Sequence, residues 1–354
     1  MQSGSPDVVV VGAGIIGGSI AWRLAQAGAA VTLLDASTLG GEASWAGAGM
    51  LAPGGEFSER SEWAEFALRS LRLYPGFVEE IEAEGCTRID FRRCGAVEIA
   101  RTPTEWRELL VRRDAQQSLG ISSEVVQAPP ETAGALFYPD DAVVDPRDVV
   151  RALRTACVAL QVSIHEQTRA SAIRLGVGRA EVETSAGPVS CGAVVLAAGA
   201  WSSAIPIFCG GQRVDIPESF PVRGHLLGYT LDPGSLGPYL RHGHTYILQR
   251  ASGFTIAGTS SETVGFDRRL DRDTIAGIHA RACELWPHLR DAGEPQAWLG
   301  FRPATEDYQP RIGRLHDTNL WLAYGHYRNG ILLAPATAER LSREIAEPGR
   351  RTSV

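Results

Sequence analysis

Two arginines near the end of the chain lie in surroundings that suggest chemistry. Arg328 belongs to a polar cluster in the segment GHYRNGILLAP (325–335), which runs directly into an apolar stretch. Arg302 lies in the segment GFRPAT. A guanidinium presents a planar pair of N–H donors that matches a carboxylate, and an ammonium group lacks this geometry. We therefore expect Arg302 to bind a carboxylate; the alternative is a structural salt bridge from Arg302 to Glu306 or Asp307.

The composition excludes several classes of function. All 34 basic residues are arginine, which excludes a Schiff-base lysine and a Walker lysine. The net charge of −7 offers no basic stripe for nucleic acid. No apolar run approaches the roughly 18 residues of a membrane span, and the N-terminus lacks the basic start of a secretory signal. The expectation is a cytoplasmic enzyme without membrane or nucleic-acid partners.

Cysteines and histidines give no metal signal. The six cysteines contain no CxxC pair, which favours free, mostly buried thiols in a reducing compartment. His242 and His244 form an HxH pair, but no carboxylate or cysteine stands at metal spacing from them. We expect ordinary surface or core histidines there, and no metal site.

The first residues carry a dinucleotide-binding pattern. Val8 to Val11 form a β-branched run, which is typical of a parallel strand buried on both faces. Gly12, Gly14 and Gly17 follow as GxGxxG and lead into an apolar helix, and a second strand ends in Asp35. The glycines allow a tight turn, a close approach to a diphosphate and close helix packing, while the helix N-terminus favours the anion. Asp35 is predicted to accept a ribose hydroxyl, which disfavours NADP.

Residues 40–52, GGEASWAGAGMLA, are nearly all small and indicate neither helix nor strand. A flexible loop is the alternative, but ordering such a loop without a ligand costs much entropy. We expect this segment to line a flat ring system, with Ala48, Gly49 and Met50 in contact.

The other elements indicate an α/β protein with two intermixed domains. Helices are expected over 58–84, 104–119 and from the Asp145-Pro146 cap to about residue 160, and strands over 93–100, 162–166 and 192–201. Residues 220–260 alternate and carry turn signals, which predicts an antiparallel sheet. We assign 1–55, 145–215 and 300–354 to a discontinuous nucleotide-binding domain, and 56–144 and 216–299 to a substrate-binding domain.

The chain resembles the D-amino-acid oxidase and sarcosine oxidase group of FAD enzymes, and within it the glycine oxidases of the thiamine-pathway type. The resemblance extends from about Val8 to Leu341. Its specific motifs are GFRPATEDYQPRIGR and GHYRNGILLAPATAE; VVGAGIIGGSIAWRLA, GAGMLAP, VVLAAGAWS and YILQR also contribute. It implies a Rossmann-like FAD-binding domain of the glutathione-reductase-2 type and a second α+β substrate domain built on an antiparallel sheet.

The resemblance also implies the site residues. Substrate binding falls to Arg302, Arg328, Tyr246 and Met50, with a plain core tyrosine as the alternative at Tyr246. The FAD contacts it implies are Gly12, Gly14, Ile15, Ile16, Gly17, Asp35, Ala36, Ala43, Ser44, Ala48, Gly49, Met50, Ala170, Ala198, Gly199, Trp201, His326, Tyr327, Arg328, Asn329, Gly330, Ile331 and Leu332. Arg328 is expected to point into the substrate pocket beside Arg302.

Further expectations concern the last segment and the substrate pocket. Asn329 and Gly330 are expected to open the last helix toward the flavin, with Pro335 within about its first turn. The segment lacks a cysteine, so non-covalent FAD is expected. Ser261 stands where a close relative has a bulkier methionine, which leaves the tolerated substrate side chain open.

The implied reaction is oxidation of glycine, and of sarcosine or small D-amino acids, by hydride transfer to flavin N5. An amine with a free lone pair can expel a hydride without a carbanion, so orientation matters more than a base. The products would be an imine or glyoxylate with ammonia, and H2O2 from O2; the imine would feed thiazole synthesis. A related dehydrogenase or D-amino-acid or sarcosine oxidase, and a non-catalytic flavin-binding protein, are the alternatives. A homo-oligomer and a thiazole-synthesis partner stay open.

Overall fold

The run of four valines forms β1, the central strand of a six-stranded sheet. The computed structural model describes residues 5–346 of the chain. In this sheet the strand order is β21-β22-β13-β1-β2-β9, and all neighbours are parallel except the β21–β22 pair. The bounds are Val8–Val11 for β1, Val31–Leu34 for β2, Ser163–His165 for β9, Ala193–Leu196 for β13, Arg311–Arg314 for β21 and Leu320–Tyr324 for β22.

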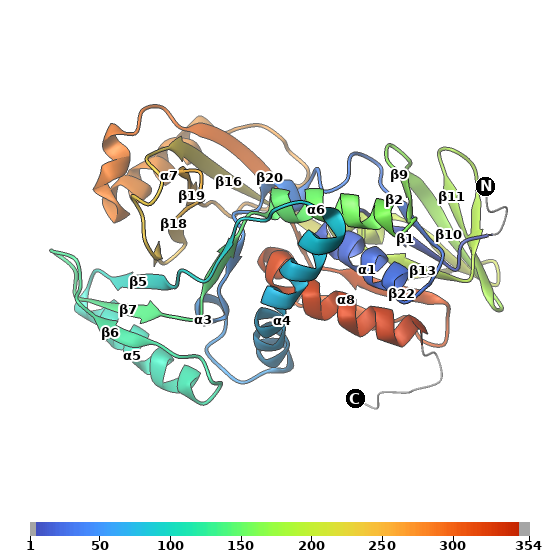
Figure 1. Ribbon diagram of the computed structural model, residues 1–354, viewed down its shortest axis with the longest axis horizontal. Coiled ribbons are helices and arrows are strands. Elements are labelled where there is room, and N and C mark those ends of the chain that lie inside the picture. The colour runs from blue at the N-terminus through green and yellow to red at the C-terminus, as the bar shows by residue number, and fades with distance from the viewer. Residues whose placement is uncertain (1–4, 347–354) are drawn as a thin grey trace.

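Both faces of this sheet are covered, as a run of consecutive apolar residues requires. Val8 and Val10 pack in a cluster with the helices on one face, and Val9 and Val11 pack on the other face. The helices are α1 (Ile15–Gln26), α4 (Glu62–Gly85), α6 (Pro146–Ala159) and α8 (Gly330–Ala346) (Figure 1). The second face carries a five-stranded sheet of β10 (Ala170–Gly176), β11 (Arg179–Thr184), β12 (Val189–Cys191), β14 (Ile207–Cys209) and β15 (Gln212–Val214).

The largest sheet has eight strands in the order β20-β16-β19-β18-β17-β5-β7-β6. It is antiparallel, as expected for 220–260, except for one parallel pair between β17 and β5. The strands are β5 (Ala96–Ala100), β6 (Glu124–Val126), β7 (Gly134–Tyr138), β16 (Phe220–Thr230), β17 (Tyr239–His242), β18 (Thr245–Gln249), β19 (Phe254–Gly258) and β20 (Gln296–Ala304). The helices α5 (Pro103–Gln117) and α7 (Arg272–Leu285) pack against it, together with the 3-10 turn η2 (Pro287–Asp291).

A short three-stranded sheet lies where the small-residue segment was predicted to be irregular. Its strands are β3 (Met50–Leu51), β8 (Ala142–Val144) and β4 (Phe91–Arg92). Along the chain, one helical turn, α2 (Ala43–Ala46), precedes β3, and another, α3 (Pro53–Glu56), follows β3. The prediction of neither helix nor strand over 40–52 is therefore wrong. The turn α2 and the strand β3 are too short to show a periodic hydrophobic pattern. In addition, β3 forms only by pairing with β8, more than 90 residues away.

Helix starts follow their capping residues. Asp145 caps α6 by accepting from the Arg147 N–H, with Pro146 in the first turn, as predicted. Thr102 and Glu105 form a full capping box at α5. Pro335 differs slightly from expectation: α8 begins at Gly330, as expected, directly after the turn η3 (Tyr327–Asn329), but the proline is its sixth residue and so lies in the second turn rather than within about the first.

The structure also bears on membrane helices, metal ligands, cysteines and the fold class. Within residues 5–346 no helix is long and apolar enough to cross a membrane, and no group of three potential metal ligands occurs. The six cysteines are free thiols, three of them buried. The α/β class, with a parallel nucleotide-binding sheet and a separate, mostly antiparallel sheet, is confirmed. The residue limits assigned to the two domains stay a prediction.

Candidate functional site

A cavity of about 1090 Å³ lies between the parallel sheet and the eight-stranded sheet. Its walls come from the β1–α1 turn, the segment 34–56, β10, the turn η1 (Gly199–Ala204), β16, β18, β20 and the chain before α8. Segments from both ends of the chain thus meet at one site, as the sequence predicted. A volume of this size holds a large organic ligand.

The glycines at the start of α1 are required by close backbone contacts. Gly12 has φ +103°, and a Cβ there would overlap the Ala197 carbonyl. A Cβ on Gly17 would overlap the Gly12 carbonyl oxygen, so α1 lies directly against the turn. Ser44 Oγ accepts from the Ile15 N–H at 2.9 Å. The helix therefore presents a narrow N-terminal cradle to the cavity, which favours an anionic group.

Asp35 fixes the same turn from the end of β2. Its Oδ2 accepts from the Ala13 N–H at 2.7 Å, and its Oδ1 accepts from the Ser37 N–H at 2.7 Å. Oδ1 also accepts from the Ser37 hydroxyl at 3.1 Å, so Oδ2 is the oxygen that keeps a second lone pair. Asp35 lines the cavity, so its position is compatible with the predicted acceptance of a ribose hydroxyl.

The small residues of 40–52 permit close packing around the cavity. Gly49 has φ +83°, and a Cβ there would overlap the Val144 carbonyl oxygen. A Cβ on Gly300 of β20 would overlap the Cβ of Ala46. Ala48, Gly49 and Met50 all line the cavity. Their predicted contact with a flat ring stays a prediction.

His326 is held as a neutral imidazole beside the cavity. It is 2% exposed, and burial lowers its pKa to about 3. Its Nε2 lies 3.2 Å from Thr337 Oγ1 on α8, while Nδ1 is buried and has no hydrogen-bond partner within the described residues. A buried polar atom without a partner is costly, and the structure shows no group that satisfies Nδ1 among the described residues.

Arg302 occupies the wall formed by β20. Its guanidinium donates to Thr259 Oγ1 at 2.8 Å and to the Ser260 carbonyl at 3.0 Å. Within residues 5–346 it forms no salt bridge, and Asp307 pairs with Arg311 instead, so the structural alternative is not realised. Burial lowers the pKa of Arg302, and the charge of Arg328 also lowers it. A partly buried cation without a carboxylate partner favours an anionic ligand.

Tyr246 lies in the same part of the cavity. It is 9% exposed on β18, and burial raises its pKa despite the positive charge of Arg302. The phenol therefore stays protonated and can donate a hydrogen bond. A Cβ on Gly258 would overlap the Tyr246 ring, so this glycine leaves the space that the ring fills.

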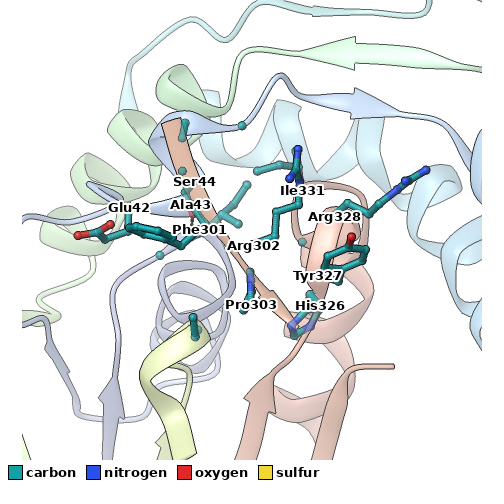
Figure 2. A pocket seen from close by; sticks show the side chains of 18 of the residues that line it. Glu42, Ala43, Ser44, Phe301, Arg302, Pro303, His326, Tyr327, Arg328 and Ile331 are labelled. Carbon is teal, nitrogen blue, oxygen red and sulfur yellow. Dashed lines mark hydrogen bonds between the residues drawn. The ribbon is translucent and has the colours of Figure 1, made fainter. Parts of the chain in front are cut away.

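Arg328 lies at the cavity but is already paired. Its Nε and Nη2 donate to Glu56 Oε1 of α3 at 2.9 and 2.7 Å. Burial lowers the pKa of Arg328, but Glu56 outweighs this effect and the net shift is upward. Figure 2 shows Arg328 beside Tyr327, with its side chain extending away from Arg302. Glu56 was missed, because 272 residues separate it from its partner and no motif links them.

The remaining predicted residues divide into two groups. Most of them line the cavity: Ile15, Ile16, Ala36, Ala43, Ser44, Ala170, Ala198, Gly199, Trp201, Tyr327, Asn329, Gly330 and Ile331. Gly17 and Leu332 do not line the cavity. Gly17 packs against the turn at Gly12, and Leu332 is 1% exposed in the hydrophobic core between the helices and the parallel sheet. Ser261 also lines the cavity, and its Oγ lies 3.5 Å from the Tyr327 hydroxyl.

Comparison with known proteins decides the family. A family model described as "FAD dependent oxidoreductase" (DAO) matches residues 7–344. The chain belongs to the DAO family of FAD-dependent oxidoreductases.

Relatives of this DAO-family chain include proteins named glycine oxidase. It is 32% identical to the glycine oxidase of Bacillus subtilis over 95% of this chain and 92% of that protein. It is 34% identical to the bifunctional protein ThiO/ThiG of Synechocystis, over 98% of this chain and 52% of that protein. The crystal structure of glycine oxidase from Geobacillus kaustophilus matches with a TM-score of 0.92 at 29% identity, covering 99% and 96% of the two chains.

The cavity of this DAO-family chain fits FAD, the family's cofactor. The Gly12–Gly14 turn and the α1 N-terminus suit a diphosphate, and Asp35 suits the adenosine ribose. The small residues around Gly49 suit the flat face of the flavin. The absence of a covalent flavin link stays a prediction.

Proposed function

We propose that this chain is an FAD-dependent oxidase of glycine and other small amino acids, including sarcosine and small D-amino acids. The observation that carries the proposal is Arg302, a partly buried guanidinium whose acceptors among the described residues are all neutral and which lines a cavity suited to FAD. The names of the relatives, glycine oxidases among them, support the same substrate class.

Arg302 would bind the substrate carboxylate through its planar donors, and the protonated Tyr246 would donate to the same group. The proposed binding would fix the α-carbon against the flavin, so that catalysis arises mainly from orientation. When bound, the FAD supplies the acceptor for a hydride from that α-carbon. For glycine, the proposed products are an imine, which water converts to glyoxylate and ammonia, and H2O2 from O2.

We assign Arg328 a different place in this proposal. Glu56 already matches its charge, so Arg328 would define the pocket wall and reach the carboxylate only if it exchanged partners. The pair lies at the substrate end of the cavity, beside Tyr246. The fusion of a related sequence in ThiO/ThiG supports a partner that consumes the imine in thiazole synthesis.

An anaerobic spectral titration tests the substrate class. Glycine, sarcosine and D-alanine should bleach the flavin of the purified protein, and admission of air should restore the oxidised spectrum rapidly. Bleaching only by large D-amino acids would contradict the proposal. Bleaching by glycine without recovery in air would indicate a dehydrogenase, and a yellow protein that no amino acid bleaches would indicate a binding protein.

A further inference from the structure

We propose that Glu262 is a positioning residue for Arg302: it anchors residues 259–262, the segment that orients the guanidinium. This inference rests on the proposed function, because it assigns Glu262 an effect on carboxylate binding. The residue lies after β19 and has no contact with Arg302 itself among the contacts of the described residues. Its effect is therefore indirect.

The guanidinium of Arg302 is oriented by two adjacent residues. Nη2 donates to Thr259 Oγ1 at 2.8 Å, and Nη1 donates to the Ser260 carbonyl at 3.0 Å. Thr259 Oγ1 in turn donates to the His225 carbonyl of β16 at 3.0 Å. The direction of the free guanidinium edge consequently depends on where the backbone of residues 259 and 260 lies.

Glu262 holds this backbone by three side-chain contacts. Its Oε2 accepts from Arg223 Nη2 at 2.5 Å, and its Oε1 accepts from Ser260 Oγ at 2.6 Å. Oε1 also lies 2.9 Å from Nδ1 of the fully buried His225. The Asp271 N–H donates to His225 Nε2 at 3.2 Å, so it is Nδ1 that donates to Glu262.

The backbone adds to the same anchor. Arg223 and Glu262 exchange N–H···O bonds at 2.9 and 3.0 Å, an isolated bridge beyond the end of β19. Burial raises the pKa of Glu262, but the hydrogen bonds from Arg223 and Ser260 and the neighbouring charges lower it below its usual value. Glu262 is thus a carboxylate at neutral pH, and it pairs with Arg223, which is 6% exposed and also pairs with Asp267.

Gly224 bounds the Arg302 guanidinium on the side opposite residues 259–262. It lies on β16 between Arg223 and His225, and a Cβ there would overlap the Arg302 guanidinium. The missing side chain leaves Arg302 room to lie across the strand. Arg302 is therefore confined between a side-chain-free strand position and the segment anchored by Glu262. A rigid partner shell of this kind sets the binding geometry of a guanidinium.

Glu262→Gln tests the proposal, because glutamine keeps the size but removes the charge and one acceptor. The readout is the Kd of acetate, an unreactive carboxylate, measured by perturbation of the flavin spectrum of the holoenzyme. We expect the acetate Kd and the glycine KM to rise by about tenfold, with kcat and the affinity for FAD nearly unchanged. Glu306→Gln, an exposed carboxylate four residues beyond Arg302, is the matched control and should alter neither value.

Two further measurements separate the possible failures. Glu262→Asp should restore part of the acetate affinity, whereas a general loss of folding would lower FAD content in both variants. Unchanged acetate affinity in Glu262→Gln, together with weak acetate binding in Arg302→Met, would overturn the role of Glu262 and leave the proposed function intact. Failure of the unaltered protein to bind acetate would overturn the carboxylate site, and this inference with it.

Discussion

At His326 a buried imidazole links pH to stability. Its pKa is about 3 in the folded chain and about 6.5 when exposed to water. Because the unfolded chain binds the proton first, the stability that neutral His326 contributes is complete above pH 6.5 and is lost as the pH falls toward 3. On going from pH 7 to pH 5, this residue should reduce the free energy of unfolding by about 2 kcal/mol.

Urea unfolding of the protein and of His326→Gln at the two pH values measures this contribution. The variant should lose less stability than the unaltered protein by that amount, since all other titrating groups are shared. Equal losses would show that His326 is not neutral in the folded chain.

Single residues also show what a sequence can reveal about a site. Arg302 and Asp35 were predicted as site residues because each lies in a motif with recognisable chemistry; both line the cavity, and their roles stay predictions. Glu56 and Glu262 were not, because they act on Arg328 and Arg223 through contacts that span 272 and 39 residues. A carboxylate in a polar loop carries no signal of its partner until the chain has folded.

Among the elements, helix α1 contains two adjacent glycines, Gly17 and Gly18, whose replacement by alanine should have opposite effects. A Cβ on Gly17 would overlap the Gly12 carbonyl oxygen, whereas a Cβ on Gly18 would meet only Leu153 Cδ1 at 3.7 Å, an ordinary contact. Gly17→Ala should therefore displace α1 from the turn and yield protein with little bound FAD. Gly18→Ala should retain FAD and gain up to about 1 kcal/mol from the better helix propensity of alanine.

Flavin absorbance of the purified variants and their unfolding in urea measure both effects. Retention of FAD by Gly17→Ala at the level of Gly18→Ala would contradict the close packing of α1 on the turn.

Elements with a strong local pattern could be predicted, and those without one could not. The valine run of β1 and the Asp145-Pro146 start of α6 were correct because hydrophobic pattern and capping determine them locally. The turn α2 and strand β3 were missed, since four and two residues cannot show periodicity. The start of α8 at Gly330 was correct, but Pro335 is the sixth residue of this helix and therefore lies in its second turn rather than within about the first.

At the scale of the whole molecule, the cofactor cavity joins segments from both sheets. Removal of FAD should therefore lower the Tm, and titration with FAD should restore it in a concentration-dependent way. Free FAD at 100 times its Kd adds about 2.7 kcal/mol to the free energy of unfolding by mass action. Riboflavin, which lacks the diphosphate and adenosine, should restore much less; equal restoration would contradict the role of the Gly12–Gly14 turn.

We propose that Arg302 binds the carboxylate of a small amino acid next to the flavin. The most direct test is steady-state oxidation of glycine by Arg302→Met, with Arg88→Met, whose side chain is 95% exposed, as control. Loss of about 1.5–3 kcal/mol of charge-assisted contact predicts a fall in kcat/KM of about 10- to 150-fold, carried by KM. FAD content and the control should be unchanged. An unaltered KM for glycine in Arg302→Met would contradict the account.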